Sequence, residues 1–374
     1  MSQPFKDYFN PAAAREIAER IHAVHPDFKK RTFVRRASKG LDELEMMGRV
    51  GLFADTLRDT LPQAIPEALG VLVASLPEPF PFEAVPREEG ALSSGFVLWP
   101  YGEYVRRYAT EHFDEAMVAM EALTQRFTSE FAVRPFVSAE PVRVVECFMS
   151  LTDHPSEHVR RWCSEGLRPR LPWGEKLAHL CADPSPILPV LEALKDDPSL
   201  YVRRSVANTL GDISKDHPEL AVKTAKRWKK GASPERQWVV RHSLRTLVKA
   251  GHPGALEVYG FAAPRSLDVD VSVSPKKIRA GESVELSLAL TNRGKKNVAL
   301  LVDFRIHYMN KSKDPKPKVF KWKELELAPG ETIHLKKKRV IKAATIRPIF
   351  SGRHAVDVQI NGKVFGDAGF HLSV

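Results

Sequence analysis

The segment His158-Val159-Arg160-Arg161-Trp162 returns in altered form as Tyr201-Val202-Arg203-Arg204-Ser205 and again as Val239-Val240-Arg241-His242-Ser243. The valines at 159, 202 and 240 are 43 and 38 residues apart. That spacing is typical of stacked two-helix units. A turn containing proline precedes each segment, and proline ends one helix and starts the next. We therefore expect three helical repeats between residues 151 and 249, with each segment opening a helix.

The repeats are expected to be of the HEAT type, and each carries basic residues in the expected first helical turn. A helix N-terminus already has a partial positive charge, so cations there disfavour the helix. One interpretation is a row of cations that faces an anionic partner. The other is that the arginines pair with acids of neighbouring repeats and are structural. The repeats alone leave both open.

Helices are also expected on the N-terminal side of the repeats. Residues 1–75 and 101–150 show apolar positions at helical spacing. Phe113, Met117, Met120, Phe127 and Phe131 are predicted to mark one face of a long helix that starts at about Asp114. Between these regions, residues 76–100 are too rich in proline for a helix and are expected to form a connection.

From Leu267 the apolar residues alternate with polar ones, which is the pattern of β-strands. About seven such runs, separated by turns such as Asn361-Gly362, predict an immunoglobulin-like sandwich. The sequence thus predicts a mainly α protein with two domains: a HEAT-like α-solenoid over residues 1–262 and a small all-β sandwich over residues 265–374.

Composition narrows the class of protein. The 374 residues contain no run of about 18 apolar residues, so no membrane contact is expected. The N-terminus lacks the pattern of a signal peptide. The three cysteines (Cys147, Cys163 and Cys181) form no metal-ligand pattern, and no glycine-rich phosphate loop is present. We expect a reduced, cytoplasmic protein without metal or cofactor.

The net charge of +11 is unevenly distributed. Residues 265–374 carry 22 basic and 11 acidic side chains, whereas the rest of the chain carries 35 of each. A basic module joined to a neutral one favours a polyanionic partner, most often nucleic acid. Improved solubility is the alternative explanation.

Two long motifs resemble the AlkC family of bacterial DNA alkylation-repair glycosylases. They run from Glu121 to Phe136 (EALTQRFTSEFAVRPF) and from His158 to Trp173 (HVRRWCSEGLRPRLPW). The opening Phe5-Lys6-Asp7-Tyr8-Phe9 and the later Trp238 to Leu247 are also similar to that family, so the resemblance covers roughly residues 1–260. The sandwich resembles the additional C-terminal module of one branch of AlkC proteins.

The resemblance implies a DNA glycosylase of base excision repair. It implies excision of cationic alkylated bases (3-methyladenine, 3-methylcytosine and 1-methyladenine) from double-stranded DNA, without conventional base flipping, as in the related AlkD enzymes. A monomer that joins the bacterial nucleoid when it acts is expected.

The residues are compatible with this chemistry. An N3-alkylated base already carries a positive charge and leaves as a neutral molecule, so no general acid is needed. A carboxylate that stabilises the sugar cation and activates a water is sufficient. Glu121 is the first candidate, Glu157 the second and Asp153 the third. Each could instead be a solvated or structural carboxylate.

Other residues of the motifs are candidates for DNA contact. Trp162 and Trp173 could stack on the base or sugar, although a tryptophan in such a helix usually belongs to the core. Candidate phosphate contacts are Arg126, Arg160, Arg161, Arg168, Arg170, Arg203, Arg204, Arg241, His242 and Arg245 in the helices and Lys336, Lys337 and Lys338 in the sandwich.

Neither central motif contains a lysine that could form a Schiff base, so a monofunctional glycosylase is predicted. Two other functions remain open. HEAT solenoids and immunoglobulin-like modules also serve as non-catalytic protein scaffolds. A protein that binds damaged DNA without cutting the glycosidic bond is the third possibility.

Overall fold

The computed structural model describes residues 4–79, 95–310, 317–342 and 348–374. Its contacts divide the chain into two compact units, residues 1–216 with 233–243, and residues 217–232 with 244–374. The predicted fold class is confirmed, since helices fill the chain up to Tyr259 and strands follow from Leu267. The second unit joins the mainly helical residues 217–232 and 244–259 to the sandwich, so the predicted domain ranges, 1–262 and 265–374, remain a prediction. Of the proline-rich connection expected over residues 76–100, residues 80–94 lie outside the described residues, and the end of the prediction is wrong, because a helix begins at Trp99 with Pro100 in its first turn.

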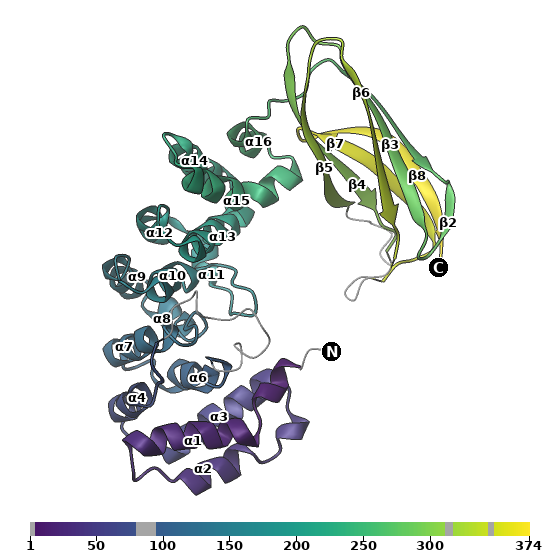
Figure 1. Ribbon diagram of the computed structural model, residues 1–374. Helices are drawn as coiled ribbons and strands as arrows, with labels where there is room; N and C mark the ends of the chain where they lie inside the picture. Colours follow the sequence, from purple (N-terminus) through teal and green to yellow (C-terminus); the bar gives the residue numbers. More distant parts are fainter. Residues whose placement is uncertain (1–3, 80–94, 311–316, 343–347) are drawn as a thin grey trace. The chain divides into compact units, whose positions relative to one another are not determined.

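The first unit is built from short helices, which stack in Figure 1 from α1 to α13. Its single-turn 3-10 elements are η1 (Phe5–Tyr8), η2 (Leu41–Glu43) and η4 (Ser185–Ile187). Its α-helices are α1 (Pro11–Val24), α2 (Lys30–Ala37), α3 (Met46–Thr60), α4 (Ile65–Ala74), α6 (Trp99–Tyr108), α7 (Phe113–Thr124), α8 (Arg134–Ala139), α9 (Pro141–Ser150), α10 (Glu157–Glu165), α11 (Ala178–Ala182), α12 (Leu188–Leu194) and α13 (Leu200–Asp216).

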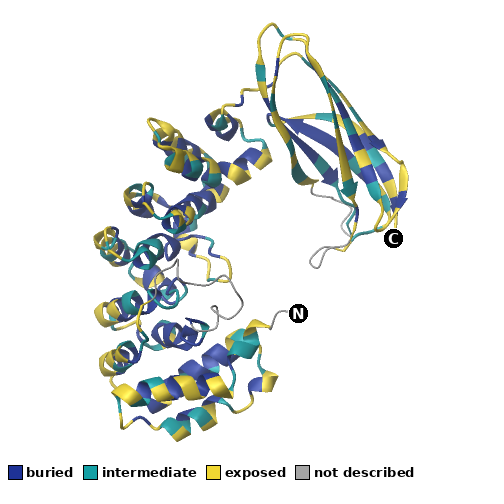
Figure 2. Cartoon of the chain, viewed as in Figure 1, coloured by how far each residue is buried: buried dark blue, intermediate teal, exposed yellow. Residues whose placement is uncertain are grey.

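The repeat valines are buried in helices that pack between repeats. Val159 on α10 and Val202 on α13 are fully buried, and the two helices pack on each other. Figure 2 shows the buried sides of the helices in this unit turned toward their neighbours. The third segment differs from the prediction, because α15 (Pro234–Ala250) already begins at Pro234. Val240 is buried in the middle of that helix rather than in its first turn.

The predicted long helix from Asp114 ends earlier than expected, at Thr124. The backbone N–H groups of Arg126 and Phe127 both donate to the carbonyl of Leu123, which tightens the last turn. The buried Ser129 hydroxyl then donates to the carbonyl of Met120. These local bonds compete with the helical ladder, so the aromatic face continues on a turn that leads into α8.

The second unit contains α14 (Pro218–Lys229), the end of α15, α16 (Pro253–Tyr259) and the sandwich. One sheet has the strand order β1-β3-β6 and the other β2-β8-β7-β4-β5. Leucines of β3, valines of β7 and Phe304 of β4 fill the core between the sheets. The strands are β1 (Leu267–Ser274), β2 (Lys277–Arg279), β3 (Ser283–Asn292), β4 (Val298–His307), β5 (Pro317–Leu327), β6 (Thr332–Val340), β7 (Gly352–Ile360) and β8 (Lys363–Ser373).

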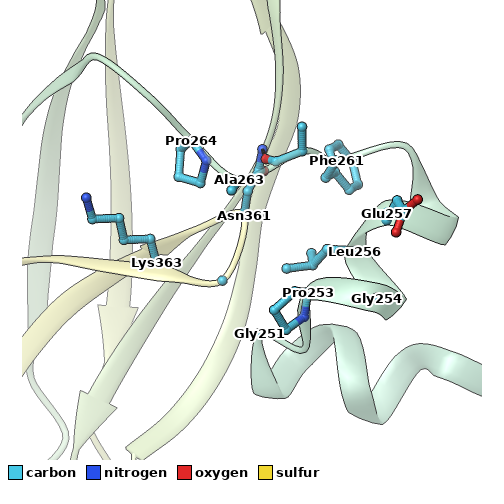
Figure 3. Close-up of a pocket in the computed structure, with 12 residues that line it drawn as sticks. Gly251, Pro253, Gly254, Leu256, Glu257, Phe261, Ala263, Pro264, Asn361 and Lys363 are labelled. Carbon is cyan, nitrogen blue, oxygen red and sulfur yellow. Dashed lines mark hydrogen bonds between the residues drawn. The ribbon is translucent and has the colours of Figure 1, made fainter. Parts of the chain in front are cut away.

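The predicted turn at Asn361-Gly362 joins β7 to β8 and also holds the linker that precedes β1. The Asn361 amide donates to the carbonyls of Ala262 and Ala299 at 2.8 and 2.9 Å. A side chain on Gly362 would meet the carbonyl of Gly251 at 2.5 Å, so the close approach requires glycine. Beside this turn lies a cavity of about 470 Å³, drawn in Figure 3 with Asn361 and residues of α16 around it.

Candidate functional site

The first catalytic candidate, Glu121, lies near the end of α7 beside His154. The Nε2 atom of His154 is 3.5 Å from the Glu121 carboxylate. The backbone N–H of Ser156 donates to His154 Nδ1 at 3.0 Å, so the neutral ring carries its proton on Nε2 and directs it toward Glu121. Arg160 donates to the His154 carbonyl at 2.7 Å and fixes the loop. A partly exposed carboxylate thus lies beside an imidazole whose own loop is fixed.

The second and third candidates lie close to His154 in sequence. Glu157 begins α10, where a carboxylate is favoured by the helix dipole, and accepts a hydrogen bond from the Ser199 hydroxyl. Asp153 is exposed and precedes His154 directly. Both carboxylates contribute, after Asp197, to a raised pKa of Arg160. The structure therefore brings Asp153 and Glu157 near one arginine, and Glu121 near the intervening histidine.

A cysteine also marks the surroundings of Glu121. Burial raises the pKa of the Cys147 thiol, and the negative charge of Glu121 adds to this rise. Cys147 lies on α9, so the carboxylate of α7 is within electrostatic range of that helix. A thiol with a raised pKa stays protonated and is a poor nucleophile. The carboxylates, rather than the Cys147 thiol, are therefore the candidate reactive groups around Glu121.

Most of the arginines predicted to contact phosphate are engaged within the protein. Arg160 forms a bidentate salt bridge with Asp197, which has only 3% of its side chain exposed. Arg203 donates to the carbonyls of Asp197 and Pro198. The structural alternative therefore applies to this group, and phosphate contact is not needed to explain it. The other paired members are Arg161 (with Glu130 and Glu165), Arg168 (with Glu165 and Asp212) and Arg170 (with Asp216).

Arg126 is engaged in the same way. Its guanidinium donates to the carbonyls of Pro77 and Ala122 at 2.6 and 2.8 Å. Burial lowers the pKa of Arg126. Two of its donors are thus used within the protein, and its contact with a phosphate beside Glu121 remains a prediction.

Four basic residues of α13 and α15 remain candidates for DNA contact. Arg204, Arg241 and Arg245 have exposed side chains. His242 stacks on Trp238 with ring centroids 4.6 Å apart and approaches Asn208 at 3.3 Å. Exposure leaves these side chains accessible to a polyanion, so the predicted role stands as a prediction.

The two candidate tryptophans have opposite environments. Trp162 is fully buried and packs edge-on against Phe148, with ring centroids 4.7 Å apart. Its expected stacking on a base is therefore wrong, because no face of the ring is accessible. Trp173 is 79% exposed and has a left-handed backbone, with φ of 63°. It alone of the pair can stack on a nucleic acid.

The sandwich presents the three predicted lysines on one edge strand. Lys336, Lys337 and Lys338 lie on β6, which pairs only with β3 in its sheet, and all three are exposed. Lys336 is 3.2 Å from Glu285, but 70% of its side chain remains accessible. Charged residues on an edge strand discourage pairing with other strands and can also attract phosphates. Further lysines of the sandwich, at positions 311, 313 and 316, lie outside the described residues.

The described residues contain neither a metal-binding cluster nor a membrane-spanning helix. No group of three or more His, Cys, Asp or Glu side chains there could hold a metal ion. Within the same ranges, each helix is too short or too polar to cross a membrane. Sequence reasoning missed His154 and Ser199, the partners of Glu121 and Glu157. The only signal for them was their position in the Pro-containing turns before the repeats.

Comparisons with known proteins agree with this architecture. A HEAT-repeat model matches residues 187–217, which cover α12 and α13. A model described as the C-terminal immunoglobulin-like domain of the uncharacterised protein YhaZ matches residues 268–374. The class of protein is thus a HEAT-repeat protein with an appended immunoglobulin-like domain.

Two full-length relatives define the family. The uncharacterized protein YhaZ of Bacillus subtilis is 36% identical over 98% of this chain and 99% of its own. The structure of the alkylpurine DNA glycosylase AlkC of Pseudomonas fluorescens, bound to DNA containing an abasic site analog, is 35% identical. It covers 100% of both chains with a TM-score of 0.88. The chain belongs to the AlkC family, which its motifs predicted.

Proposed function

We propose that this protein is a monofunctional DNA glycosylase that removes cationic alkylated bases from double-stranded DNA. The full-length similarity to an alkylpurine DNA glycosylase, including both domains, carries the proposal. The proposed substrates are 3-methyladenine, 3-methylcytosine and 1-methyladenine, excised without conventional base flipping. The protein is proposed to act as a monomer.

The reaction needs little acid catalysis. The alkylated base carries a positive charge, and the glycosidic electron pair moves onto the base as the bond to C1′ breaks. A neutral base leaves, and positive charge develops on the sugar. A water molecule then attacks C1′ and gives its proton to a carboxylate. The protein must therefore supply negative charge and a base at one place.

Glu121 is the proposed general base. Its carboxylate is partly exposed, so a water and a sugar can approach it, and His154, 3.5 Å away, is proposed to orient it. Glu157, oriented by Ser199, is the proposed second carboxylate that stabilises the sugar cation. Asp153 is the third candidate because it is the most exposed. DNA backbone contacts are proposed for Arg204, Arg241, Arg245 and the lysines of β6.

The decisive experiment compares base release by Glu121→Gln with release by the wild type at saturating protein. The charge is lost while the shape is kept, so the single-turnover rate should fall by roughly 10²–10⁴-fold with unchanged DNA affinity. Glu115→Gln is the matched control, since Glu115 is an exposed carboxylate of the same helix. It should release bases at the wild-type rate.

The outcomes separate the three functions. A wild-type protein that releases no base from methylated duplex DNA but binds it would be a damage-binding protein. A protein that neither releases a base nor binds DNA would be a scaffold. Full activity of Glu121→Gln would move the proposed general base to Glu157 or Asp153.

The role of His154 has its own test. Truncation in His154→Ala frees the Glu121 side chain and should slow base release about tenfold, whereas DNA affinity should stay unchanged. His154→Gln can still donate to the carboxylate and should recover most of the rate. In the Glu121→Gln background, His154→Ala should add no further loss. An additive loss would assign His154 a separate role.

A further inference from the structure

A second cavity, of about 360 Å³, lies in the first unit. Its lining comes from the start of α3, from α6, from the turn before α8 and from the loop after α10, and includes Met46, Met47, Trp99, Phe131, Arg134 and Trp173. The volume is at the small end of ligand pockets, which span roughly 300–1,000 Å³. The carboxylates proposed for catalysis do not line it, so it is a separate feature.

The walls of the cavity are aromatic and preformed. Trp99 is only 5% exposed and stacks on Phe131, with ring centroids 5.4 Å apart and ring planes 14° from parallel. Phe127 supports Trp99 at 5.4 Å. Because these rings support one another, the cavity keeps its shape without a ligand. Met46 and Met47 add polarisable thioethers, which favour contact with aromatic rings.

Trp173 lies at the rim of the cavity and has an unfavourable backbone conformation. Its φ of 63° is disfavoured for a bulky residue by about 1–2 kcal/mol. The loop is fixed by bonds from the Gly174 N–H to the Leu171 carbonyl and from the Leu177 N–H to the Pro169 carbonyl, both 3.1 Å. An indole that is 79% exposed gains little from packing. A strained, exposed aromatic side chain beside a cavity points to a ligand.

Glu103 and Arg134, two charged groups of the cavity, already have hydrogen-bond partners within the protein. Glu103 accepts from Arg106 and Arg107 at 2.6–2.8 Å. Arg134 donates to the carbonyls of Glu175 and Arg168, and burial lowers its pKa to about 10. The cavity therefore does not require a strongly charged ligand. It suits a flat, neutral ring whose edge carries hydrogen-bonding groups.

We propose that this cavity binds a nucleobase, with Trp173 stacked on its face. Two sources share this chemistry: the neutral base released by the reaction, or a base that has left the stack in bound DNA. The inference rests on the proposed function for the origin of the base. The binding itself can be measured with free adenine, independently of catalysis.

The test uses the full-length protein and two probes. In the first arm, equilibrium dialysis with labelled adenine compares the wild type with Trp173→Phe and Trp173→Ala. Stacking predicts a loss of at least tenfold in Trp173→Ala and less than threefold in Trp173→Phe. Met47→Ala, at a second exposed position of the lining, should weaken adenine binding by a smaller factor. Trp322→Phe in the sandwich is the control and should bind normally.

In the second arm, 2-aminopurine is placed opposite an abasic-site analogue in duplex DNA. A change in its fluorescence on binding that disappears in Trp173→Ala identifies a base of the DNA as the occupant. Adenine binding that depends on Trp173 without this change identifies the released base. Adenine binding that is absent or independent of Trp173, together with no Trp173-dependent fluorescence change, overturns the proposal. Adenine binding without base release from methylated DNA would instead refute the proposed function and leave the cavity assignment standing.

Discussion

Charged side chains are placed differently in the two units. In the helical unit, buried charges are paired between neighbouring repeats, as in Arg160 with Asp197 and Arg168 with Asp212. In the sandwich, Arg305 pairs with Asp357, but the excess cations lie on the surface of β6, and the buried Asp303 is only within electrostatic range of two lysines. Basic residues in this chain therefore have two different structural roles. Paired arginines hold the solenoid together, whereas exposed lysines remain accessible to a polyanion.

The largest expected effect is on the paired arginines. Arg160→Ala leaves the carboxylate of Asp197 buried without its guanidinium and should lower the free energy of unfolding by about 3–5 kcal/mol. Chemical denaturation of the full-length protein measures this change. Lys337→Ala on β6 is the control and should alter stability by less than about 0.5 kcal/mol. A stable Arg160→Ala protein with weak DNA binding would favour the phosphate-contact interpretation instead.

Replacement of Asp303 in the sandwich should have the opposite effect and raise the free energy of unfolding at pH 8. Burial raises the pKa of this carboxyl group from its ordinary 3.8 to about 6. The folded state therefore holds the proton more tightly than the unfolded state, and stability falls as the pH rises from about 4 to 6. Asp303→Asn removes this loss and should stabilise the protein by about 2–3 kcal/mol at pH 8.

At pH 4 the wild type and Asp303→Asn should unfold with nearly equal free energies, because Asp303 is protonated in the folded state. Asp357→Asn is an instructive contrast. Asp357 accepts from Arg305 at 2.5 and 2.8 Å, so its replacement should destabilise the sandwich at neutral pH. A pH-independent gain from Asp303→Asn would show that packing, not ionisation, causes it.

Exposed lysines should affect binding rather than folding. Replacement of Lys336, Lys337 and Lys338 by glutamine should weaken binding to undamaged duplex DNA and reduce the salt dependence by about one unit of slope per lost contact. Fluorescence anisotropy at several salt concentrations measures both. Deletion of residues 265–374 should give a larger change in the same direction. Unchanged salt dependence in both variants would remove the sandwich from the DNA interface.

Local periodicity made much of the fold predictable. The helical spacing around the buried valines 159 and 202 and the alternation of apolar residues after Leu267 are patterns that a short stretch of sequence already contains. The end of α7 was not predictable, because Ser129 terminates it through a bond to Met120. Nor was the pairing of Arg160 with Asp197, which are 37 residues apart. The spacing of the motifs cannot say which carboxylate an arginine meets.

The candidate site shows the same limit. The family motifs drew attention to Glu121, but its partner His154 lies 33 residues away and outside both motifs. The two tryptophans of one motif could not be distinguished, although Trp162 is buried and Trp173 exposed. The difference arises because Trp162 lies within a packed helix, whereas Trp173 lies in a loop with a left-handed backbone. Only tertiary structure separates a core residue from a contact residue here.

The smallest expected effect tests whether the strain at Trp173 serves function. Glycine adopts a φ of 63° without the steric penalty that alanine pays, so Trp173→Gly should unfold with a free energy about 1 kcal/mol higher than Trp173→Ala. Both variants should lose adenine binding equally, since both lack the indole. Thermal denaturation and dialysis together measure the two properties. If Trp173→Ala is as stable as Trp173→Gly, the backbone at Trp173 is not strained in solution. Backbone strain would then not be part of the explanation for the exposed indole.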